Sequence, residues 1–157
     1  MPGQSTEIVI EAPRAEVWAV LSNLETAERY DAFIERASYV SEARSGVGAA
    51  RQCDLPDGSS IQERVIAWDE GTGYEIEASD DPTEAFPLIN QRVRFDLESP
   101  ANGTLVRMTF SYDYAPTIEI ATSEADDMAT GLLAGVLGGL KHLMETGEPA
   151  PIPQPVA

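Results

Sequence analysis

One long apolar stretch between Asp126 and Met144 constrains the fold of this chain most, because glycine recurs along one side of it. Apolar residues spaced three and four apart predict an amphipathic helix there. Gly131, Gly135 and Gly139 follow at four-residue steps, which places them along one side of that helix. Glycine inside a helix costs about 1 kcal/mol relative to alanine. A helix side without Cβ atoms admits either another backbone or a ligand, and both explanations remain open.

The composition limits the classes of protein to which the chain can belong. With 157 residues it is long enough for one domain with its own core. The formal net charge of −17 repels phosphate groups, so we expect no nucleic-acid partner and no membrane insertion. The single cysteine, Cys53, has no ligand cluster around it, and we expect no metal and no cofactor. Residues 1–6 do not resemble a signal peptide, so we expect a cytoplasmic location.

The spacing of the apolar residues changes from strand to helix and back along the chain. A strand is expected over Gln4–Glu11, followed by two short helices, one beginning near Pro13 and one over Glu25–Tyr30. Six more strands separated by turn residues predict an antiparallel meander. They are expected near Arg36–Glu42, Ala49–Leu55, Ser60–Asp69, Tyr74–Ala78, Gln91–Glu98 and Thr104–Tyr114. Residues 1–147 should form a single domain, and residues 148–157 a proline-rich flexible tail.

Seven antiparallel strands and one long helix predict an α+β fold. A sheet with one apolar face curves around such a helix and buries that face against it. Where the helix side chains are small, space stays open between helix and sheet. A largely apolar cavity of this kind is the usual place for a small-molecule ligand.

The order of elements and several short motifs resemble the helix-grip fold of the START and birch-pollen-allergen (SRPBCC) superfamily. Within it, the chain is most similar to the polyketide cyclase/dehydrase and lipid-transport group. The motifs, in chain order, are Glu11-Ala12-Pro13 with Val17–Leu21, then Gly46–Arg51, Asp57-Gly58 with Glu63-Arg64-Val65, and Gly103-Thr104. The resemblance spans about Ser5–Glu145 and implies a seven-stranded antiparallel sheet curved around the C-terminal helix. Such folds include carriers, receptors and cyclases, so the resemblance does not fix an activity.

The alternation of side chains along the strands identifies those that should face the cavity. It places Arg51 and Glu63 inward on neighbouring strands, where each is expected to pair with the other or with a ligand. The pair either belongs to the pocket wall or orients a carboxylate, hydroxyl or carbonyl of a ligand. The expected ligand-binding residues are Asp31, Arg51, Cys53, Glu63, Tyr74, Ile76, Gln91, Val93, Phe95, Met108, Phe110, Tyr112, Gly131, Gly135 and Gly139.

The resemblance bears on two polar positions. In hormone-receptor relatives the position matching Asp31 carries a basic residue that meets an acidic ligand, and the carboxylate here argues against the same mode. In aromatase/cyclase relatives the principal polar residue of the site is an arginine near the end of the strand that follows the Asp-Gly turn. Ala67 stands at the matching position, which argues against the same cyclisation mechanism.

Two functions of the cavity are considered from the sequence. The leading hypothesis is binding of a small, largely apolar molecule between the sheet and the C-terminal helix, by a monomer or a homodimer. The alternative is a polyketide cyclase/dehydrase-type enzyme, with Glu63 as general base and Arg51 or Tyr112 polarising a carbonyl.

A third hypothesis places the function outside the cavity. A protein-interaction module would use Leu133, Leu137 and Met144, which flank the apolar arc of the long helix. For a ligand cavity, the entrance is expected between the Leu55–Ser59 turn, the Asp80–Leu88 loop and the start of that helix.

Overall fold

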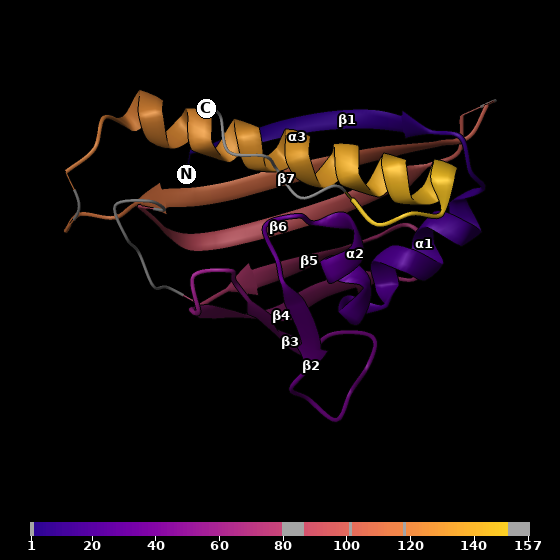
Figure 1. Ribbon diagram of the computed structural model, residues 1–157, viewed down its shortest axis with the longest axis horizontal. Helices are drawn as coiled ribbons and strands as arrows, with labels where there is room; N and C mark the ends of the chain where they lie inside the picture. The colour runs from indigo at the N-terminus through magenta and orange to yellow at the C-terminus, as the bar shows by residue number, and fades with distance from the viewer. Residues whose placement is uncertain (1, 80–86, 101, 118, 151–157) are drawn as a thin grey trace.

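The computed structural model describes residues 2–79, 87–100, 102–117 and 119–150. A curved antiparallel sheet wraps around one long helix, which confirms the α+β helix-grip fold (Figure 1). The elements, in order, are β1 (Gly3–Ile10), α1 (Arg14–Ser22), the 3₁₀ helix η1 (Leu24–Thr26), α2 (Ala27–Tyr30), β2 (Arg36–Tyr39), β3 (Ala50–Asp54), β4 (Ser60–Asp69), β5 (Gly73–Ala78), β6 (Leu88–Glu98), β7 (Thr104–Tyr114) and α3 (Thr122–Thr146).

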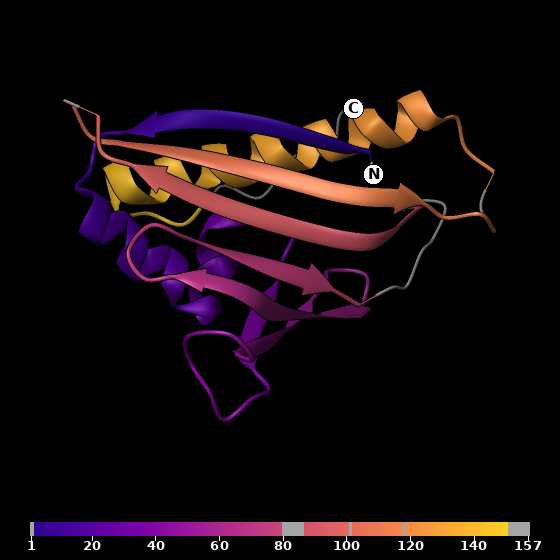
Figure 2. The same cartoon turned by 180° about the vertical axis from the view of Figure 1, so that it is seen from behind.

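The strands lie in the order β1-β7-β6-β5-β4-β3-β2, and each neighbouring pair is antiparallel. Strands β2 to β7 therefore form the expected meander, and β1 joins its last strand. The helices lie on one face of the sheet, as the views from the two sides show (Figures 1 and 2). This arrangement gives the sheet one covered face, which is where the apolar residues gather.

Local sequence signals explain where the helices begin and end. Pro13 precedes α1 with φ of −62°, a value that its ring fixes, and its carbonyl accepts the first helical hydrogen bond from Val17 N at 3.1 Å. Helix α3 ends at Gly147, whose left-handed φ of 78° lets its N–H bond to Leu143 O at 2.8 Å. Among the described residues, no helix is long and apolar enough to span a membrane.

Helix α3 packs on β1 and β7 and, through its second half, on α2. It does not cover the whole sheet: β3 to β6 curve away beneath its first half (Figure 1). Leu133 and Leu137, which the interaction-module hypothesis places at an interface, are instead buried in the core at 1% and 2% exposure. The helix is rotated so that this side rests on the sheet, while Met144 stays partly buried.

Candidate functional site

A buried ion pair marks the polar part of the interior. Arg51 on β3 lies directly opposite Glu63 on β4. The Arg51 Nε and Nη2 atoms are both 2.9 Å from Glu63 Oε1. The two residues are only 4% and 9% exposed. The ion pair expected from strand alternation is therefore confirmed, and it lies inside the fold.

The rest of the Arg51 guanidinium ties the sheet to the helices. Its Nη1 atom donates to the carbonyl oxygen of Leu24 in η1 at 3.0 Å. Burial lowers the pKa of Arg51, but the Glu63 carboxylate together with Tyr30, Tyr74 and Cys53 outweighs burial and holds that pKa well above the ordinary value. Arg51 thus stays charged, and its guanidinium is hydrogen-bonded to Glu63 and to the Leu24 carbonyl.

Cys53 shares the same carboxylate oxygen. Its thiol donates to Glu63 Oε1 at 3.3 Å. Burial, together with the neighbouring Glu63 charge, raises the pKa of the Cys53 thiol. The thiol therefore stays protonated, and a nucleophilic role has no support. No described residue hydrogen-bonds the second oxygen of Glu63, Oε2.

Two buried tyrosines lie beside this pair. Tyr30 ends α2 and Tyr74 lies on β5, and both are fully enclosed at 2% and 0% exposure. Their hydroxyls lie near each other and near Arg51 and interact with both, but neither forms a hydrogen bond of good geometry with a described residue. Burial raises the pKa of both phenols. Both hydroxyls are fully enclosed, so these two phenols belong to the packed interior around Arg51 and not to an accessible surface.

Asp31 adds a second carboxylate at the end of α2. It is half-buried, and its Oδ1 atom accepts a hydrogen bond from the Phe33 N–H at 3.0 Å. Burial raises the pKa of Asp31 to about 6; the Glu63 charge raises it too, while the Phe33 hydrogen bond and Arg51 oppose the shift. Asp31 and Glu63 thus border the same polar region from the helix side and from the sheet side.

The glycines of α3 differ in their surroundings. A Cβ atom at Gly139 would collide with the backbone carbonyl of Tyr30, so this glycine permits close packing of α3 on α2. A Cβ atom at Gly135 would lie 3.0 Å from Cε2 of Phe33, and one at Gly131 would meet nothing within 4 Å. The expectation that Gly139 lines a cavity is therefore wrong, because backbone fills that space. Gly131 and Gly135 are exposed, with Gly135 beneath the Phe33 ring.

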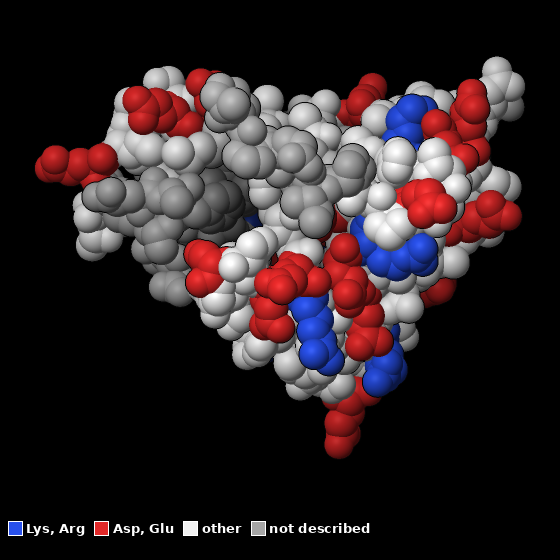
Figure 3. Space-filling view, in the orientation of Figure 1, with Lys and Arg blue, Asp and Glu red and all other residues white. Residues whose placement is uncertain are grey.

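Some apolar side chains on the covered face of the sheet are not fully packed. Ile61 on β4 and Val93 on β6 are on the covered face, as their partners Cys53 and Phe110 are buried, yet both remain partly exposed. Leu132 of α3 is also only partly buried. The surface is hollowed beneath the first half of α3 (Figure 3). The covered face is therefore not filled by the described side chains of this chain.

The other expected site residues divide by position. Six lie buried on the covered face, namely Tyr74, Ile76, Phe95, Met108, Phe110 and Tyr112. Gln91 lies at a bulge between β6 and β7 and donates to Leu88 O at 3.1 Å. The Tyr112 hydroxyl donates to Asp126 Oδ1 of α3 at 2.6 Å. It is three strands from Glu63, about 14 Å along the sheet, so the structure does not bring these two groups together.

An aromatic cluster that sequence reasoning missed closes the end of the interior next to α1. Trp18 of α1 lies 5.1 Å from Trp68, whose ring stacks on Tyr74 at 5.6 Å. A register shift between Val65 and Ala67 turns Trp68 onto the covered face, since Trp68 pairs with Tyr74. Simple alternation from Val65 would turn Ala67 inward instead, and no sequence signal marks this bulge.

The proposed entrance is only partly described. The Leu55–Ser59 turn is a tight turn in which Gly58 N donates to Leu55 O at 3.0 Å. Residues 80–86, which make up most of the expected Asp80–Leu88 loop, lie outside the described residues. Phe33 was not among the expected residues, but its side chain lies over Gly135 and is 45% exposed.

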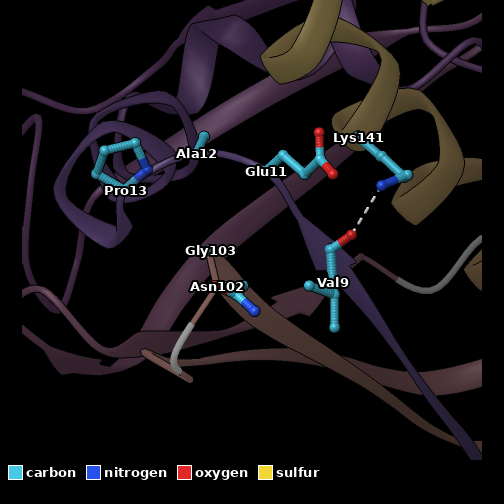
Figure 4. A pocket seen from close by; sticks show the side chains of 7 residues that line it. All are labelled: Val9, Glu11, Ala12, Pro13, Asn102, Gly103 and Lys141. Carbon is cyan, nitrogen blue, oxygen red and sulfur yellow. Dashed lines mark hydrogen bonds between the residues drawn. The ribbon is translucent and has the colours of Figure 1, made fainter.

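A separate depression of about 840 Å³ lies at the β1 edge, lined by Val9, Glu11, Ala12, Pro13, Asn102, Gly103 and Lys141 (Figure 4). The Lys141 ammonium donates to Val9 O at 2.9 Å and to Glu145 Oε2 at 2.6 Å. Both contacts of the Lys141 ammonium are therefore within the chain. The depression lies at β1, which is five strands away from β3, the strand that carries Arg51. This depression is distinct from the interior expected from the sequence. No cluster of metal ligands is found among the described residues.

A curved antiparallel sheet closed by a C-terminal helix over a mostly apolar interior defines a protein of helix-grip fold. The chain belongs to the polyketide cyclase/dehydrase and lipid transport family, whose model matches residues 1–145. No curated protein sequence matches the chain significantly.

Solved structures with the same fold are distant in sequence. XoxI from Bacillus cereus is 19% identical, with a TM-score of 0.78 and coverage of 93% of this chain and 97% of that one. A START superfamily protein from Mycobacterium smegmatis is 14% identical, with a TM-score of 0.74 and coverage of 91% and 97%. The di-domain aromatase/cyclase BexL of the BE-7585A biosynthetic pathway is 15% identical, with a TM-score of 0.76 and coverage of 92% and 47%. At these identities the likeness concerns the fold alone.

Proposed function

We propose that this protein binds a small, largely apolar molecule in the hollow between the sheet and the first half of α3. The observation that supports this most is the partial exposure of Ile61 and Val93 on the covered face. Apolar side chains at the centre of a sheet are normally packed, and each square ångström of apolar surface removed from water contributes about 25 cal/mol. A ligand that fills the hollow gains this free energy.

The same geometry favours binding over catalysis. Glu63 Oε1 is held by Arg51 and Cys53, and Arg51 donates to Glu63 and to Leu24 O. The Tyr112 hydroxyl is held by Asp126. The cyclase alternative would need Glu63 as base and Arg51 or Tyr112 as electrophile. Glu63 Oε2 has no partner among the described residues, but Arg51 is engaged by Glu63 and Leu24 O and the Tyr112 hydroxyl is three strands away, so no free electrophile lies beside this oxygen. The family includes both lipid transport and cyclases by its description, which is compatible with either function.

Filling the hollow tests the proposal. Val93 and Arg92 are neighbours on β6 that point to opposite faces, so Val93→Trp places an indole in the hollow and Arg92→Trp places it on the outer face. Titration with the neutral fluorescent probe N-phenyl-1-naphthylamine should show saturable binding to the wild type. We expect Val93→Trp to weaken this binding at least about tenfold and Arg92→Trp to leave it within about threefold.

The outcomes separate a binding cavity from a packed interior. Thermal midpoints of both variants establish that they are folded. Absence of saturable probe binding to the wild type would overturn the proposal, and so would equal weakening by the two folded variants. Native mass spectrometry of freshly purified protein adds an independent readout, since a co-purified small molecule should be retained by the wild type and lost from Val93→Trp.

A further inference from the structure

The described part of the chain ends on the helix that covers the hollow. Beyond the cap of α3 at Gly147 the chain turns back, and Ala150 N donates to Arg29 O of α2 at 2.7 Å (Figure 1). The Ala150 Cβ atom lies 3.0 Å from the position that a Cβ atom would take at Gly139. Gly139 precedes Gly147 by eight residues, which is about 12 Å along a helix axis. The chain therefore runs back along the glycine side of α3, toward the half of that helix above the hollow.

The same side of α3 is bare further along this path. A Cβ atom at Gly131 would meet no described atom within 4 Å, and one at Gly135 would meet only the ring of Phe33. Phe33 is 45% exposed, although a large apolar ring gains free energy when it is packed. Beyond Ala150, α3 thus offers open backbone with an exposed aromatic ring beside it.

The residues that follow Ala150 suit this path in length and composition. Residues 151–157, Pro-Ile-Pro-Gln-Pro-Val-Ala, have no charged side chain, although the formal net charge of the chain is −17. Alternating prolines favour the extended polyproline II conformation, which rises about 3.1 Å per residue. Four such residues cover about 12 Å, which is also the distance along a helix from Gly139 to Gly131. Proline-rich segments of this kind bind to exposed aromatic rings such as that of Phe33.

Resting on the proposed function, we infer that residues 151–157, the C-terminal segment, bind along the Gly131–Gly135 side of α3 against Phe33 and cover the opening of the hollow. In this arrangement Ile152 lies near Gly135 and Gln154 near Gly131. The segment is tethered at Ala150, so its effective concentration at α3 is on the order of millimolar. It therefore competes with a ligand for the opening, and ligand entry requires the segment to move aside.

Disulfide formation between the C-terminal segment and α3 tests where the segment lies. Gln154→Cys is combined either with Gly131→Cys or with Gly138→Cys, and both variants are oxidised with copper phenanthroline. The two glycines are exposed, and a Cβ atom at either meets no described atom within 4 Å, so both variants should fold. The native Cys53 is buried and should not react. We expect the Gly131 pair to oxidise at least about tenfold faster, because only this pair lies within disulfide distance.

Gly138 is the matched control because it lies closer to Ala150 along α3 but points to another side of the helix. A segment free in solution would reach Gly138 at least as readily as Gly131. Trypsin cleaves after Lys141, so under denaturing, non-reducing conditions the cross-linked product joins residues 108–141 to residues 142–157 and is identified by its mass. Equal oxidation rates of the two pairs would overturn the inference, and so would a disulfide that joins two molecules, seen in the intact mass.

Binding of N-phenyl-1-naphthylamine tests the competition. A chain that ends at Ala150 should bind this probe about three- to tenfold more tightly than the full chain, because the competing segment is gone. The double variant Ile152→Ser/Val156→Ser keeps the length of the segment but removes its two large apolar side chains, and it should show a similar gain. Wild-type affinity in either of these proteins would overturn the inference.

The two readouts distinguish this inference from the function on which it rests. Saturable probe binding with equal oxidation of the two cysteine pairs would leave ligand binding standing and overturn the position of the segment. Faster oxidation of the Gly131 pair without saturable probe binding to any of the proteins would support that position and overturn ligand binding in the hollow.

Discussion

At the scale of single residues, the carboxyl group of Asp31 lies in an environment that opposes its charge. Burial, and then the Glu63 carboxylate on β4, raise the pKa of Asp31 to about 6, against the opposing Phe33 amide and Arg51 on β3. The ordinary value is 3.8. Between these two values the folded state holds a proton that the unfolded state has released. Asp31 therefore contributes less to stability as the pH rises from about 4 to about 6.

Asp31→Asn should reveal this contribution as a pH-dependent gain. Above pH 6 the variant removes a desolvated charge, and we expect its free energy of unfolding to exceed that of the wild type by about 1–3 kcal/mol. As the pH falls below 3.8 the carboxyl becomes protonated in the unfolded state as well, so the difference should shrink toward zero. Urea unfolding of both proteins between pH 3.5 and pH 8 measures it. A difference that stays constant over this range would contradict the raised pKa of Asp31.

The polar residues were predictable to different degrees. Arg51 and Glu63 follow from alternation on two strands joined by the short turn at Asp57-Gly58, which sets their register. Tyr30 and Phe33 come from α2 and the segment after it, where no strand period applies. The direction of their side chains depends on how α2 packs against α3 at Gly139. This packing is a tertiary contact, and no local sequence signal predicts it.

At the scale of elements, α3 shows how one glycine side serves different purposes along a helix. Gly139 lets the Tyr30 carbonyl approach the helix backbone, while the neighbouring Gly138 is exposed and would have nothing within 4 Å of a Cβ atom. These adjacent glycines therefore separate the steric effect of a methyl group from its effect on helix propensity.

Alanine substitution at the two positions should have opposite effects. Gly138→Ala gains helix propensity without a clash, and we expect it to stabilise the fold by about 0.5–1 kcal/mol. Gly139→Ala forces α3 away from α2, and we expect a loss of about 1–3 kcal/mol or failure to fold. Urea unfolding monitored by circular dichroism compares them. Similar stability of the two variants would show that α2 yields easily and that Gly139 does not fix the packing.

The elements themselves were largely predictable, and their irregularities were not. β4 and β7 match their predicted bounds, because turn residues precede both strands at Asp57-Gly58 and Asn102-Gly103. β6 begins at Leu88 instead of Gln91, since Asn90 adopts φ of 52° and the strand continues through the resulting bulge. Such bulges depend on pairing with the neighbouring strand, as does the register shift that turns Trp68 inward.

At the scale of the whole molecule, acidic residues dominate the electrostatics. The chain has 27 acidic and 10 basic residues. Asp and Glu side chains spread over the face seen in Figure 3, with few Lys and Arg among them. Exposed ion pairs such as Arg64–Glu77, at 2.8 Å, stabilise a fold by about 0–1 kcal/mol each. Because acidic residues outnumber basic ones, most carboxylates cannot form such ion pairs. Their mutual repulsion therefore opposes the compact state.

Salt should therefore stabilise this protein. Raising NaCl from 0.01 M to 1 M shortens the Debye length from about 30 Å to about 3 Å and screens repulsion between distant carboxylates. It weakens the exposed ion pairs as well, but these are outnumbered. We expect the thermal midpoint to rise by about 3–6 °C, equivalent to 1–2 kcal/mol for a chain of this size.

A variant with fewer surface charges provides the control for this effect. Four exposed glutamates without an ion pair among the described residues are suitable for replacement by glutamine: Glu35, Glu42, Glu98 and Glu119. With four fewer negative charges, the variant should have a higher midpoint at low salt and a smaller rise on addition of NaCl. If salt acted by a general effect on hydrophobic burial, the rise would be the same in both proteins. A falling midpoint in the wild type would show instead that ion pairs contribute more to its stability than carboxylate repulsion removes.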